Sequence, residues 1–479
     1  MTRASADIGR GLAAARAARP IKPGERIHVL GAAGAGASAA VLLAHRAGAR
    51  VNGCDPGGPS PYTAALAEAG IPLDWRHDAA HVDMPPEQRP ERLAVTKALT
   101  AVNPNHPELL AARRLGIPTE AWQQLVADAA ATTGQHLVAV AGTHGKSTTV
   151  GWLVDLLVRA GRDPSAFVGA LLDPALTGTS ASTARWGSGD VFVVEADEYA
   201  GNFDPYRPSV IVLLNAEWDH PDVFADANAV YDAFAAWIRA AGRATLVANV
   251  ADPGVREVLA RLSERTGTVV RAGEEPLPYL VGLPGPANAA NAAAIVAIGR
   301  VLDVPERAIE ASLAQFRGVG RRLELKGEVG GVVVLDDYGH HPTAIAKTIE
   351  AVRERYPGRR LWAVYEPLTF HRTAAMLEQF AEVLATADEV AIADIWAGRD
   401  TDTTVTNAAA LADAVTRRGG PRAAAPGSVE ATADYLATRV QPGDVVLVMG
   451  GGRSYVIAAR LVELLRACSA GRHPEHGGP

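Results

Sequence analysis

The stretch Gln135-His136-Leu137-Val138-Ala139-Val140-Ala141-Gly142-Thr143-His144-Gly145-Lys146-Ser147-Thr148-Thr149 decides the fold of this chain. An apolar run typical of a buried strand stops at Gly142, a tight turn follows, and a helical pattern covers residues 150–158. A strand, a glycine loop, a Lys-Ser pair and a helix together are typical of a phosphate-binding loop. The helix N-terminus attracts anions through its backbone N–H groups and a dipole worth about half a positive charge. We expect Lys146 to reach the outer phosphates of a nucleotide and Ser147 to place its hydroxyl on Mg²⁺.

The loop departs from the common phosphate-binding pattern in its length. That pattern has four residues between its two glycines, whereas only Thr143 and His144 separate Gly142 from Gly145 here. An ordinary strand-to-helix turn with an accidental Lys-Ser pair is the alternative. The flanking strand and helix favour phosphate binding, because they are the context that confirms the motif.

Composition limits the class of protein. The 479 residues predict two to four domains, and a hydrophobic content of 48% is enough to build their cores. A net charge of −7 argues against a nucleic-acid partner, and no stretch is long enough to span a membrane. The two cysteines, Cys54 and Cys468, cannot form a disulfide framework, and the first 20 residues lack the apolar segment of a secretory signal. We therefore expect a cytoplasmic protein. The sequence does not give the oligomeric state, and a monomer or a homodimer is expected.

A second glycine-rich turn lies near the N-terminus. Residues 27–30 predict a strand, Gly31-Ala32-Ala33-Gly34-Ala35-Gly36 a turn, residues 38–45 a helix, and residues 49–55 a strand ending in Asp55. This unit is similar to a dinucleotide-binding unit, in which the acid holds a ribose. Its glycine spacing differs from the dinucleotide fingerprint, so a nucleoside diphosphate suits the turn as well. A turn that only packs helix against strand is an equal alternative.

Two buried-type strands after the phosphate loop end in polar clusters. Residues 191–194 lead into Glu195-Ala196-Asp197-Glu198, and residues 210–214 lead into Asn215-Ala216-Glu217-Trp218-Asp219-His220. Sheets of α/β proteins bind ligands at the carboxyl ends of their strands. Glu195 and His220 are therefore candidates for binding Mg²⁺ or reacting groups, with capping of the strand ends as the alternative. Between the clusters and the loop, the Gly-, Ser- and Thr-rich residues 174–188 predict a mobile loop.

The rest of the chain predicts a further α/β unit. Asn288 and Asn291 open a helix that runs to about Leu302; Asn288 is expected to cap it, with contact to a nucleotide base as the alternative. Four strands, at residues 331–335, 361–365, 389–394 and 444–449, then alternate with helices. We predict an α/β protein of three domains: a Rossmann-like N-terminal domain (1–131), a central P-loop ATPase-like domain with a mostly parallel sheet (132–318) and a Rossmann-like C-terminal domain (319–479).

Read together, these motifs resemble those of the Mur ligase family, the ATP-dependent amino-acid ligases of peptidoglycan synthesis. Residues 142–148 are similar to the ATP loop of that family, including its short glycine spacing, and residues 195–198, 215–220, 288–291 and 336–343 follow in the family's order. The run Asp336-Asp337-Tyr338-Gly339-His340-His341-Pro342-Thr343 most resembles the branch that joins L-alanine to UDP-N-acetylmuramate. The resemblance spans roughly residues 27–452.

The resemblance implies that the three domains bind UDP-N-acetylmuramate, ATP and an amino acid, in that order. ATP would phosphorylate the lactyl carboxylate, and the amine would attack the resulting acyl phosphate. By position, Lys146, Glu195 and His220 would be catalytic, and Ser147, Glu195 and His220 would hold Mg²⁺. The resemblance assigns to ATP Gly142, Thr143, His144, Gly145, Lys146, Ser147, Thr148, Asn288, Asn291, Arg321, Arg322 and Asp337. It assigns to the UDP-sugar Gly31, Gly34, Gly36, Ser38 and Asp55, and to the amino acid Tyr338, His340 and Arg372.

One segment departs from the L-alanine branch. Where that branch usually has a Gln-Pro-His-Arg type run, this chain has Glu366-Pro367-Leu368-Thr369-Phe370-His371-Arg372, and only Arg372 keeps its place. The Glu-Pro pair and residues 199–208 are similar to the related ligase that recycles a murein tripeptide. A divergent or recycling ligase that joins a tripeptide or another amino acid is therefore the alternative. Two other classes stay open: a P-loop ATPase that acts as a switch, and a nicotinamide-dependent dehydrogenase.

Overall fold

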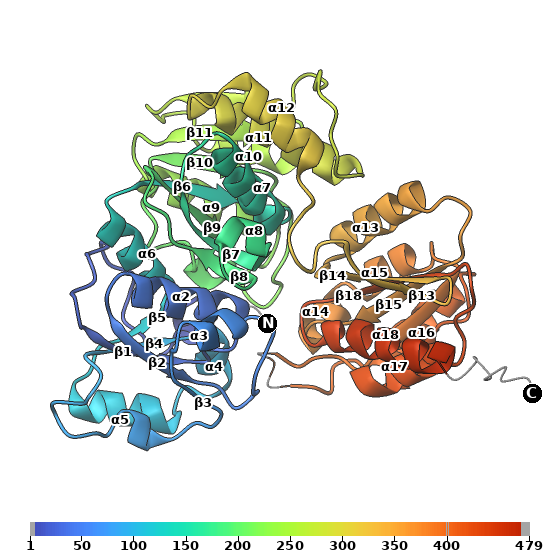
Figure 1. The fold of residues 1–479 in the computed structure, drawn as a ribbon, viewed down its shortest axis with the longest axis horizontal. Coiled ribbons are helices and arrows are strands. Elements are labelled where there is room, and N and C mark those ends of the chain that lie inside the picture. Colours follow the sequence, from blue (N-terminus) through green and yellow to red (C-terminus); the bar gives the residue numbers. More distant parts are fainter. Residues whose placement is uncertain (1–4, 399, 401, 471–479) are drawn as a thin grey trace, which may run out of the picture. The chain divides into compact units, whose positions relative to one another are not determined.

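The computed structural model describes residues 5–398, 400 and 402–470. They form two compact units, one within residues 1–283 and 288–319 and the other within residues 284–287 and 320–479. The first unit contains two mostly parallel sheets and the second contains one (Figure 1). In the described part of the chain, no helix is both long enough and apolar enough to cross a membrane.

The N-terminal sheet, in blue and cyan, has the doubly wound order β3-β2-β1-β4-β5 with parallel pairing throughout (Figure 1). Its two faces carry separate apolar clusters, one against α2 and α6 and the other against α5. The strands are β1 (Arg26–Leu30), β2 (Arg50–Cys54), β3 (Leu73–Asp74), β4 (Arg92–Val95) and β5 (Thr119–Ala121). The helices are α1 (Ser5–Ile8), α2 (Ala35–Arg46), α3 (Ala64–Glu68), η1 (Ala79–His81), α4 (Lys97–Val102), α5 (Pro107–Leu115) and α6 (Trp122–Thr133).

A buried ion network fastens the segment before β1 to this sheet. Arg92 contacts Glu25, Glu120 and Asp128 at 2.9, 2.7 and 2.5 Å, and all four side chains are at least 90% buried. Arg16 adds a second cation to Asp128 at 2.6 Å. Because each buried carboxylate faces a guanidinium, the residues before β1 are tied to α6.

The central sheet is built around β6, the strand that precedes the phosphate loop. Its order is β12-β11-β10-β6-β9-β7-β8, and its pairs are parallel except β7 with β8. Along β6, Val138 and Val140 face the cluster of α7 and α11, while Ala139 and Ala141 face the cluster of α9 and α10. The strands are β6 (His136–Ala141), β7 (Ser165–Leu172), β8 (Ser182–Arg185), β9 (Val191–Ala196), β10 (Val210–Leu213), β11 (Thr245–Asn249) and β12 (Val269–Ala272). The helices are α7 (Lys146–Arg159), α8 (Pro174–Thr177), η2 (Tyr199–Gly201), α9 (Ala227–Ala240), α10 (Pro253–Ala260), α11 (Pro286–Val301) and α12 (Glu306–Gln315).

The prediction of a loop over residues 174–188 is wrong. The segment contains α8 and β8, and β8 pairs antiparallel with β7, a strand that was not predicted. Small residues are needed there because β8 packs against α2: Thr183 is 1% exposed and its hydroxyl lies 3.1 Å from that of Ser38. The Ser and Thr residues of this segment therefore allow β8 to pack closely against α2, and they do not indicate a loop.

A second correction concerns Asn288, which was predicted to cap its helix. Helix α11 begins at Pro286, so Asn288 is its third residue. Proline suits the first turn of a helix because its missing N–H would have no helical partner. The structure thus leaves the Asn288 side chain on the first turn instead of at the cap.

The C-terminal unit has the sheet order β13-β14-β18-β15-β16-β17, parallel except for the β13–β14 hairpin. Gly330 and Gly331 form the hairpin turn with φ of 61° and 82°, which suits the two-residue turns that need positive φ. The strands are β13 (Glu324–Val329), β14 (Val332–Asp337), β15 (Leu361–Glu366), β16 (Glu389–Ala393), β17 (Ala424–Gly427) and β18 (Val445–Gly450). The helices are α13 (Pro342–Arg355), α14 (Phe370–Ala375), α15 (Leu377–Leu384), α16 (Ala408–Arg417), α17 (Val429–Ala437) and α18 (Ser454–Ala470).

The α/β class is confirmed, and the mostly parallel central sheet with it. The three sheets lie inside the three predicted domains, although β13 and β17 were not predicted. The domain limits at residues 131/132 and 318/319 stay a prediction.

Candidate active site

The phosphate loop is held in a conformation that requires glycine at two positions. Gly142 has φ 141° and Gly145 has φ 80°, and α7 begins directly after Gly145. A Cβ on Gly145 would lie 2.6 Å from Oδ1 of Asn291, and a Cβ on Gly142 would lie 3.1 Å from the backbone of Asn215. Gly145 therefore lets α11 approach the loop closely, and Gly142 lets the segment after β10 do so; a side chain at either position would block that approach.

The segment after β10 fixes the rest of the loop. The backbone N–H of His144 donates to Oδ1 of Asn215 at 2.8 Å, and Nδ2 of Asn215 donates to the carbonyl of His144 at 3.0 Å. Thr143 is held in the same way, because its hydroxyl donates to the carbonyl of Glu217 at 3.1 Å. A loop held at these two residues presents its N–H groups in a fixed direction, as anion binding requires.

Lys146 lies among carboxylates at the start of α7. Its ammonium contacts Oε2 of Glu198 at 3.0 Å, Oδ1 of Asp197 at 3.5 Å and the carbonyl of Gly142 at 2.7 Å. Burial alone would lower the pKa of Lys146, but the charges of Glu198, Asp197 and Glu195 outweigh burial and raise that pKa. Lys146 is therefore a permanent cation at the helix N-terminus.

Ser147 and Glu195 form one group of oxygen donors. The Ser147 hydroxyl donates to Oε1 of Glu195 at 3.1 Å, and the backbone N–H of Gly169 donates to Oε2 at 2.6 Å. A Cβ on Gly169 would lie 2.7 Å from Oε1, so the glycine on β7 makes room for the carboxylate. Glu195, near the C-terminal end of β9, is thus held against the first turn of α7, and its role as a metal ligand stays a prediction.

His220 belongs to a second donor group beside the first. Its Nε2 lies 3.8 Å from Oε1 of Glu198 and 3.7 Å from Asp219, and its ring packs on Tyr199 at 4.9 Å. Asp197, Glu198 and His220 each offer a ligand atom within 4.8 Å of the others. Burial raises the pKa of Glu198. Burial would also raise the pKa of Asp197, but the positive charges of Lys146 and His220 outweigh burial there and lower that pKa. The three predicted metal ligands therefore divide between two neighbouring groups: Ser147 and Glu195 form one, and His220 lies in the other with Asp197 and Glu198, which were not predicted as ligands.

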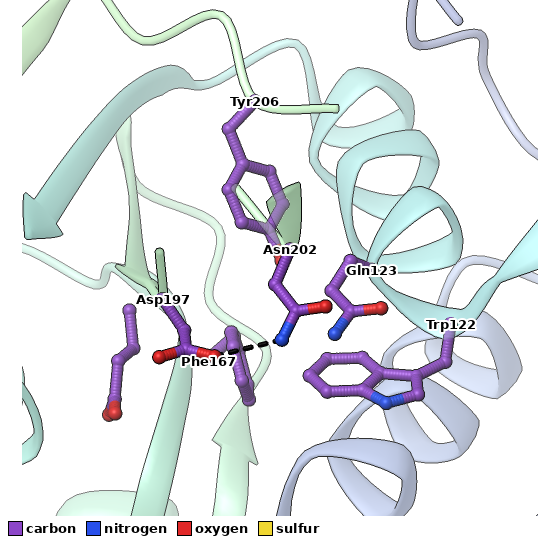
Figure 2. Close-up of a pocket in the computed structure, with 7 residues that line it drawn as sticks. Trp122, Gln123, Phe167, Asp197, Asn202 and Tyr206 are labelled. Atoms are coloured by element: carbon purple, nitrogen blue, oxygen red, sulfur yellow. Dashed lines mark hydrogen bonds between the residues drawn. The ribbon is translucent and has the colours of Figure 1, made fainter. Parts of the chain in front are cut away.

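A pocket opens between these carboxylates and the start of α6, where Trp122 and Gln123 lie (Figure 2). The space between its walls, counted together with the adjoining open solvent, is about 260 Å³. Its walls come from α6, β7, β9 and the segment after η2, through Trp122, Gln123, Phe167, Glu195, Asp197, Asn202 and Tyr206. Asn202 donates to Oδ2 of Asp197 at 2.8 Å, which is the dashed line in Figure 2.

Polar atoms in this pocket lack protein partners. Oε1 of Gln123, Oδ1 of Asn202 and the Tyr206 hydroxyl are buried and make no hydrogen bond within the described protein. Buried polar atoms cost free energy unless they are satisfied, so a polar ligand or water at this place is expected. The Trp122 and Phe167 rings, which meet edge to face at 5.4 Å, add an apolar wall.

The predicted N-terminal residues shape the glycine-rich turn. Gly31 has φ 83°, and a Cβ on Gly36 would lie 2.3 Å from the Trp122 ring. Gly34 is the N-cap of α2. The Ser38 hydroxyl is buried and donates to the carbonyl of Ala35 at 3.0 Å, while Asp55 accepts from the backbone N–H of Ala33 at 3.0 Å. Ser38 and Asp55 thus stabilise the turn in this structure, and their contact with a UDP-sugar stays a prediction.

In the C-terminal unit, Arg321 and Asp337 are deeply buried. Arg321 contacts Oδ2 of Asp336 at 3.2 Å and donates to the carbonyl of Gly450 at 2.9 Å. Asp337 accepts from the N–H groups of Leu323 at 2.9 Å and Gly339 at 2.7 Å, and burial raises its pKa. The Arg322 guanidinium lies over the Tyr338 ring at 5.1 Å. These residues lie together within this unit, and their role in ATP binding stays a prediction.

The amino-acid residues predicted by resemblance also cluster within this unit. The Tyr338 and His340 rings meet edge to face at 5.3 Å, and Nδ1 of His340 lies 3.0 Å from the carbonyl of Tyr338. A Cβ on Gly451 would touch Leu368 at 3.0 Å and lie 3.4 Å from Tyr338, so the divergent Leu368 joins this cluster. Arg372, on α14, is 1% exposed.

Sequence reasoning missed several residues of the site. Asp197 and Glu198 were quoted only as part of a run, although they are the partners of Lys146, and Asn215 was not singled out. Each lies within two residues of the end of a buried strand, and polar residues at strand ends are the signal that identified Glu195 and His220. Gln123 and Asn202 carry no such signal, because only the fold brings α6 and the residue after η2 to the same pocket.

Three domain models of one protein family match successive parts of this chain. Residues 26–133 match the Mur ligase family catalytic domain, residues 140–279 the Mur ligase middle domain, and residues 321–452 the Mur ligase glutamate ligase domain. A UDP-N-acetylmuramate–L-alanine ligase of Burkholderia thailandensis is 33% identical over 470 residues, covering 92% of this chain and 98% of the relative. The chain belongs to the Mur ligase family. Membership favours the ligase over the switch ATPase and the dehydrogenase.

Solved structures share the fold. The UDP-N-acetylmuramate–alanine ligase of Thermotoga maritima superimposes with a TM-score of 0.74 at 22% identity, covering 93% of this chain and 99% of that one. A murein peptide ligase of Psychrobacter arcticus gives a TM-score of 0.67 at 23% identity, covering 92% and 99%. At these identities, the likeness shows the fold of a Mur ligase alone.

Proposed function

We propose that this Mur ligase joins L-alanine to the lactyl carboxylate of UDP-N-acetylmuramate in peptidoglycan synthesis, with conversion of ATP to ADP and phosphate. The observation that carries the proposal is a nearly full-length match, at 33% identity, to a relative named for that reaction. The geometry around Lys146 supports the chemistry, since a cation at a helix N-terminus faces the place where phosphates bind. The cytoplasm, as the compartment that holds ATP, is part of the proposal.

The reaction needs an activated acyl group, because a carboxylate is a poor electrophile. In the proposed sequence a carboxylate oxygen attacks the γ-phosphorus and ADP leaves. The amine then attacks the acyl carbon, loses a proton, and expels phosphate. Lys146 and the N–H groups of the loop would stabilise the charge on the transferred phosphoryl group. The turn fixed by Asn215 would hold that group in line for attack.

The donor set fits a divalent metal ion, and we propose Mg²⁺. Ser147 and Glu195 offer hydroxyl and carboxylate oxygens 3.1 Å apart at the first turn of α7, which is the chemistry that Mg²⁺ prefers. The neighbouring group of Asp197, Glu198 and His220 would bind a second ion or the acyl phosphate. When bound, a divalent ion would neutralise charge on the phosphates.

We assign the pocket of Figure 2 to the sugar-acid end of the UDP-sugar. The carbonyl oxygens of Gln123 and Asn202 and the Tyr206 hydroxyl are unsatisfied there, and a sugar carries hydroxyl and amide groups that would satisfy them. Gly31, Gly34 and Gly36 would leave room for the diphosphate at the start of α2. A Gln123→Met variant should then raise the KM for the UDP-sugar and leave the KM for ATP unchanged; equal rises in both would contradict the assignment.

We assign the amino acid to the C-terminal unit, where Tyr338 and His340 lie beside Leu368. Arg372 would face its carboxylate. Arg321, Arg322 and Asp337 would contribute to ATP binding, and Asn288 and Asn291 would face the nucleotide. The UDP-sugar, ATP and amino-acid domains would be residues 1–131, 132–318 and 319–479, in a monomer or a homodimer.

A substrate panel tests the proposed function. Purified protein is incubated with ATP, Mg²⁺ and UDP-N-acetylmuramate, and separately with L-alanine, glycine, L-serine or the murein tripeptide. Phosphate release should be fastest with L-alanine and should require the UDP-sugar. Release with the tripeptide but not with L-alanine would replace this proposal by the recycling ligase.

A further inference from the structure

A second cluster of metal-ligating side chains lies in the N-terminal sheet, away from the phosphate loop. His28 is on β1, Cys54 ends β2, His81 ends η1, and Glu108 is in the first turn of α5. His28, Cys54 and Glu108 are each at most 1% exposed, and the His81 side chain is 14% exposed. Four polar residues from distant parts of the chain thus meet beneath α5, next to an apolar cluster that includes Val82, Leu93 and Leu109.

Several distances within this cluster are close to those between the ligands of a tetrahedral ion. Bond lengths of about 2.0 Å to nitrogen or oxygen and about 2.3 Å to sulfur put ligand atoms roughly 3.3 to 3.6 Å apart. Nε2 of His28 lies 3.0 Å from Oε2 of Glu108 and 3.3 Å from Sγ of Cys54. Sγ of Cys54 lies 3.6 Å from that Oε2, and Nδ1 of His81 lies 3.4 Å from Oε1 of Glu108. Each of the four residues offers an atom within 4.8 Å of the others.

Each imidazole has a hydrogen-bond acceptor on the side that faces away from the cluster. Nδ1 of His28 lies 2.8 Å from Oδ1 of Asn52, and Nε2 of His81 lies 3.0 Å from Oδ2 of Asp74. Both oxygens are acceptors, so each ring can donate outward and leave its inner nitrogen for a metal ion. An outer acceptor on each ring is the usual surrounding of a metal-bound histidine.

We propose that His28, Cys54, His81 and Glu108 bind a structural Zn²⁺ ion. Two imidazoles, a thiolate and a carboxylate suit zinc better than Mg²⁺ or Ca²⁺, which prefer oxygen ligands only. With four protein ligands the site is closed to substrate, so its role is structural. The ion would join β1 and β2 to η1 and α5, and its ligand Cys54 directly precedes Asp55, a residue assigned to the UDP-sugar.

Other polar groups surround this cluster and are not needed as ligands. Nδ1 of His77 lies 3.2 Å from Sγ of Cys54 and 3.6 Å from Oε1 of Glu108. The backbone N–H of Asp78 donates to the same Oε1 at 3.0 Å. His106 stacks edge to face on His77 at 4.5 Å, and its Nδ1 accepts from the backbone N–H of Glu108. His77 is therefore a neighbour that can replace His81, and the experiment includes both.

The test is metal analysis of the full chain, purified without a histidine tag or chelator. Mass spectrometry of the elements should find about one zinc ion per chain. Cys54→Ser and His81→Asn should each lose most of it, whereas Cys468→Ser, which changes the exposed cysteine on α18, should keep it. A His77→Asn variant that loses zinc while His81→Asn keeps it would move the fourth ligand to His77 and overturn the assignment of His81.

Cobalt substitution keeps the proposal testable if a variant does not fold. Wild-type protein is stripped with a chelator, checked by circular dichroism and titrated with Co²⁺. A thiolate-to-cobalt charge-transfer band, together with the intense visible bands of a four-coordinate ion, would support the site. Absence of both zinc and the cobalt spectrum from folded wild-type protein would refute the proposal, as would equal zinc in wild type, Cys54→Ser and His81→Asn.

Discussion

Replacing Gly145 by alanine tests the close approach of Asn291, on α11, to the phosphate loop. The new Cβ would lie 2.6 Å from Oδ1 and 3.3 Å from Cγ of Asn291, and the residue would keep a φ of 80°. The left-handed conformation costs about 1–2 kcal/mol for a residue other than glycine. The overlap with Asn291 adds roughly 1–3 kcal/mol, because Asn291 is 6% exposed and has little room to move. Gly145→Ala should therefore lower the free energy of unfolding by about 2–5 kcal/mol.

Gly161→Ala is the matched control. Gly161 follows α7 and has φ 75°, and a Cβ there would meet nothing within 4 Å. Gly161→Ala should therefore lower the free energy of unfolding only by the cost of the left-handed conformation. Urea denaturation gives both losses of stability, and calorimetric titration gives the ATP affinity. Gly145→Ala should weaken ATP binding at least about tenfold, equivalent to about 1.4 kcal/mol, and Gly161→Ala should not. Adding Asn291→Ala should restore part of the stability of Gly145→Ala. Equal stability losses in the two single variants, with unchanged ATP affinity, would refute the reasoning.

Three further predictions concern charged side chains. Lys146→Ala should reduce ATP-dependent phosphate release at least about a hundredfold with the circular dichroism spectrum unchanged; release within a few fold of wild type would exclude its role. Arg92→Met should cost about 3–5 kcal/mol in urea denaturation because Glu25, Glu120 and Asp128 would lose their buried cation, whereas Arg26→Met, which removes a 3.7 Å pair with the exposed Glu91, should cost at most about 1 kcal/mol. Burial lowers the pKa of Lys97 to about 8, so the folded state binds fewer protons than the unfolded state between pH 8 and the ordinary value of 10.5. The unfolding free energy of wild type relative to Lys97→Met should therefore rise by up to about 3 kcal/mol as the pH increases through that range; a constant difference would contradict the shift.

Residues whose positions follow from strand ends were predictable. Glu195 lies at the C-terminal end of β9 and His220 in the segment after β10, and parallel pairing of both strands with β6 brings these ends to the edge where Lys146 begins α7. The phosphate loop was predictable for the same reason, since strand, turn and helix are contiguous in sequence. Their roles in binding stay predictions.

Contacts that depend on packing between distant segments were not predictable. β8 was taken for part of a loop because its small polar residues are buried by α2, which lies far away in sequence. The Arg92 network and the pocket at Gln123 and Asn202 likewise need two segments more than 15 residues apart to meet. The hydrophobic pattern of one segment does not indicate which distant segment it will contact.

The most direct test of the central claim follows an oxygen atom. UDP-N-acetylmuramate labelled with oxygen-18 in its lactyl carboxylate is incubated with the protein, ATP, Mg²⁺ and L-alanine. If the carboxylate is activated as an acyl phosphate, mass spectrometry will detect UDP-N-acetylmuramoyl-L-alanine and phosphate that carries a labelled oxygen. Phosphate without the label, or no L-alanine adduct, would contradict the account.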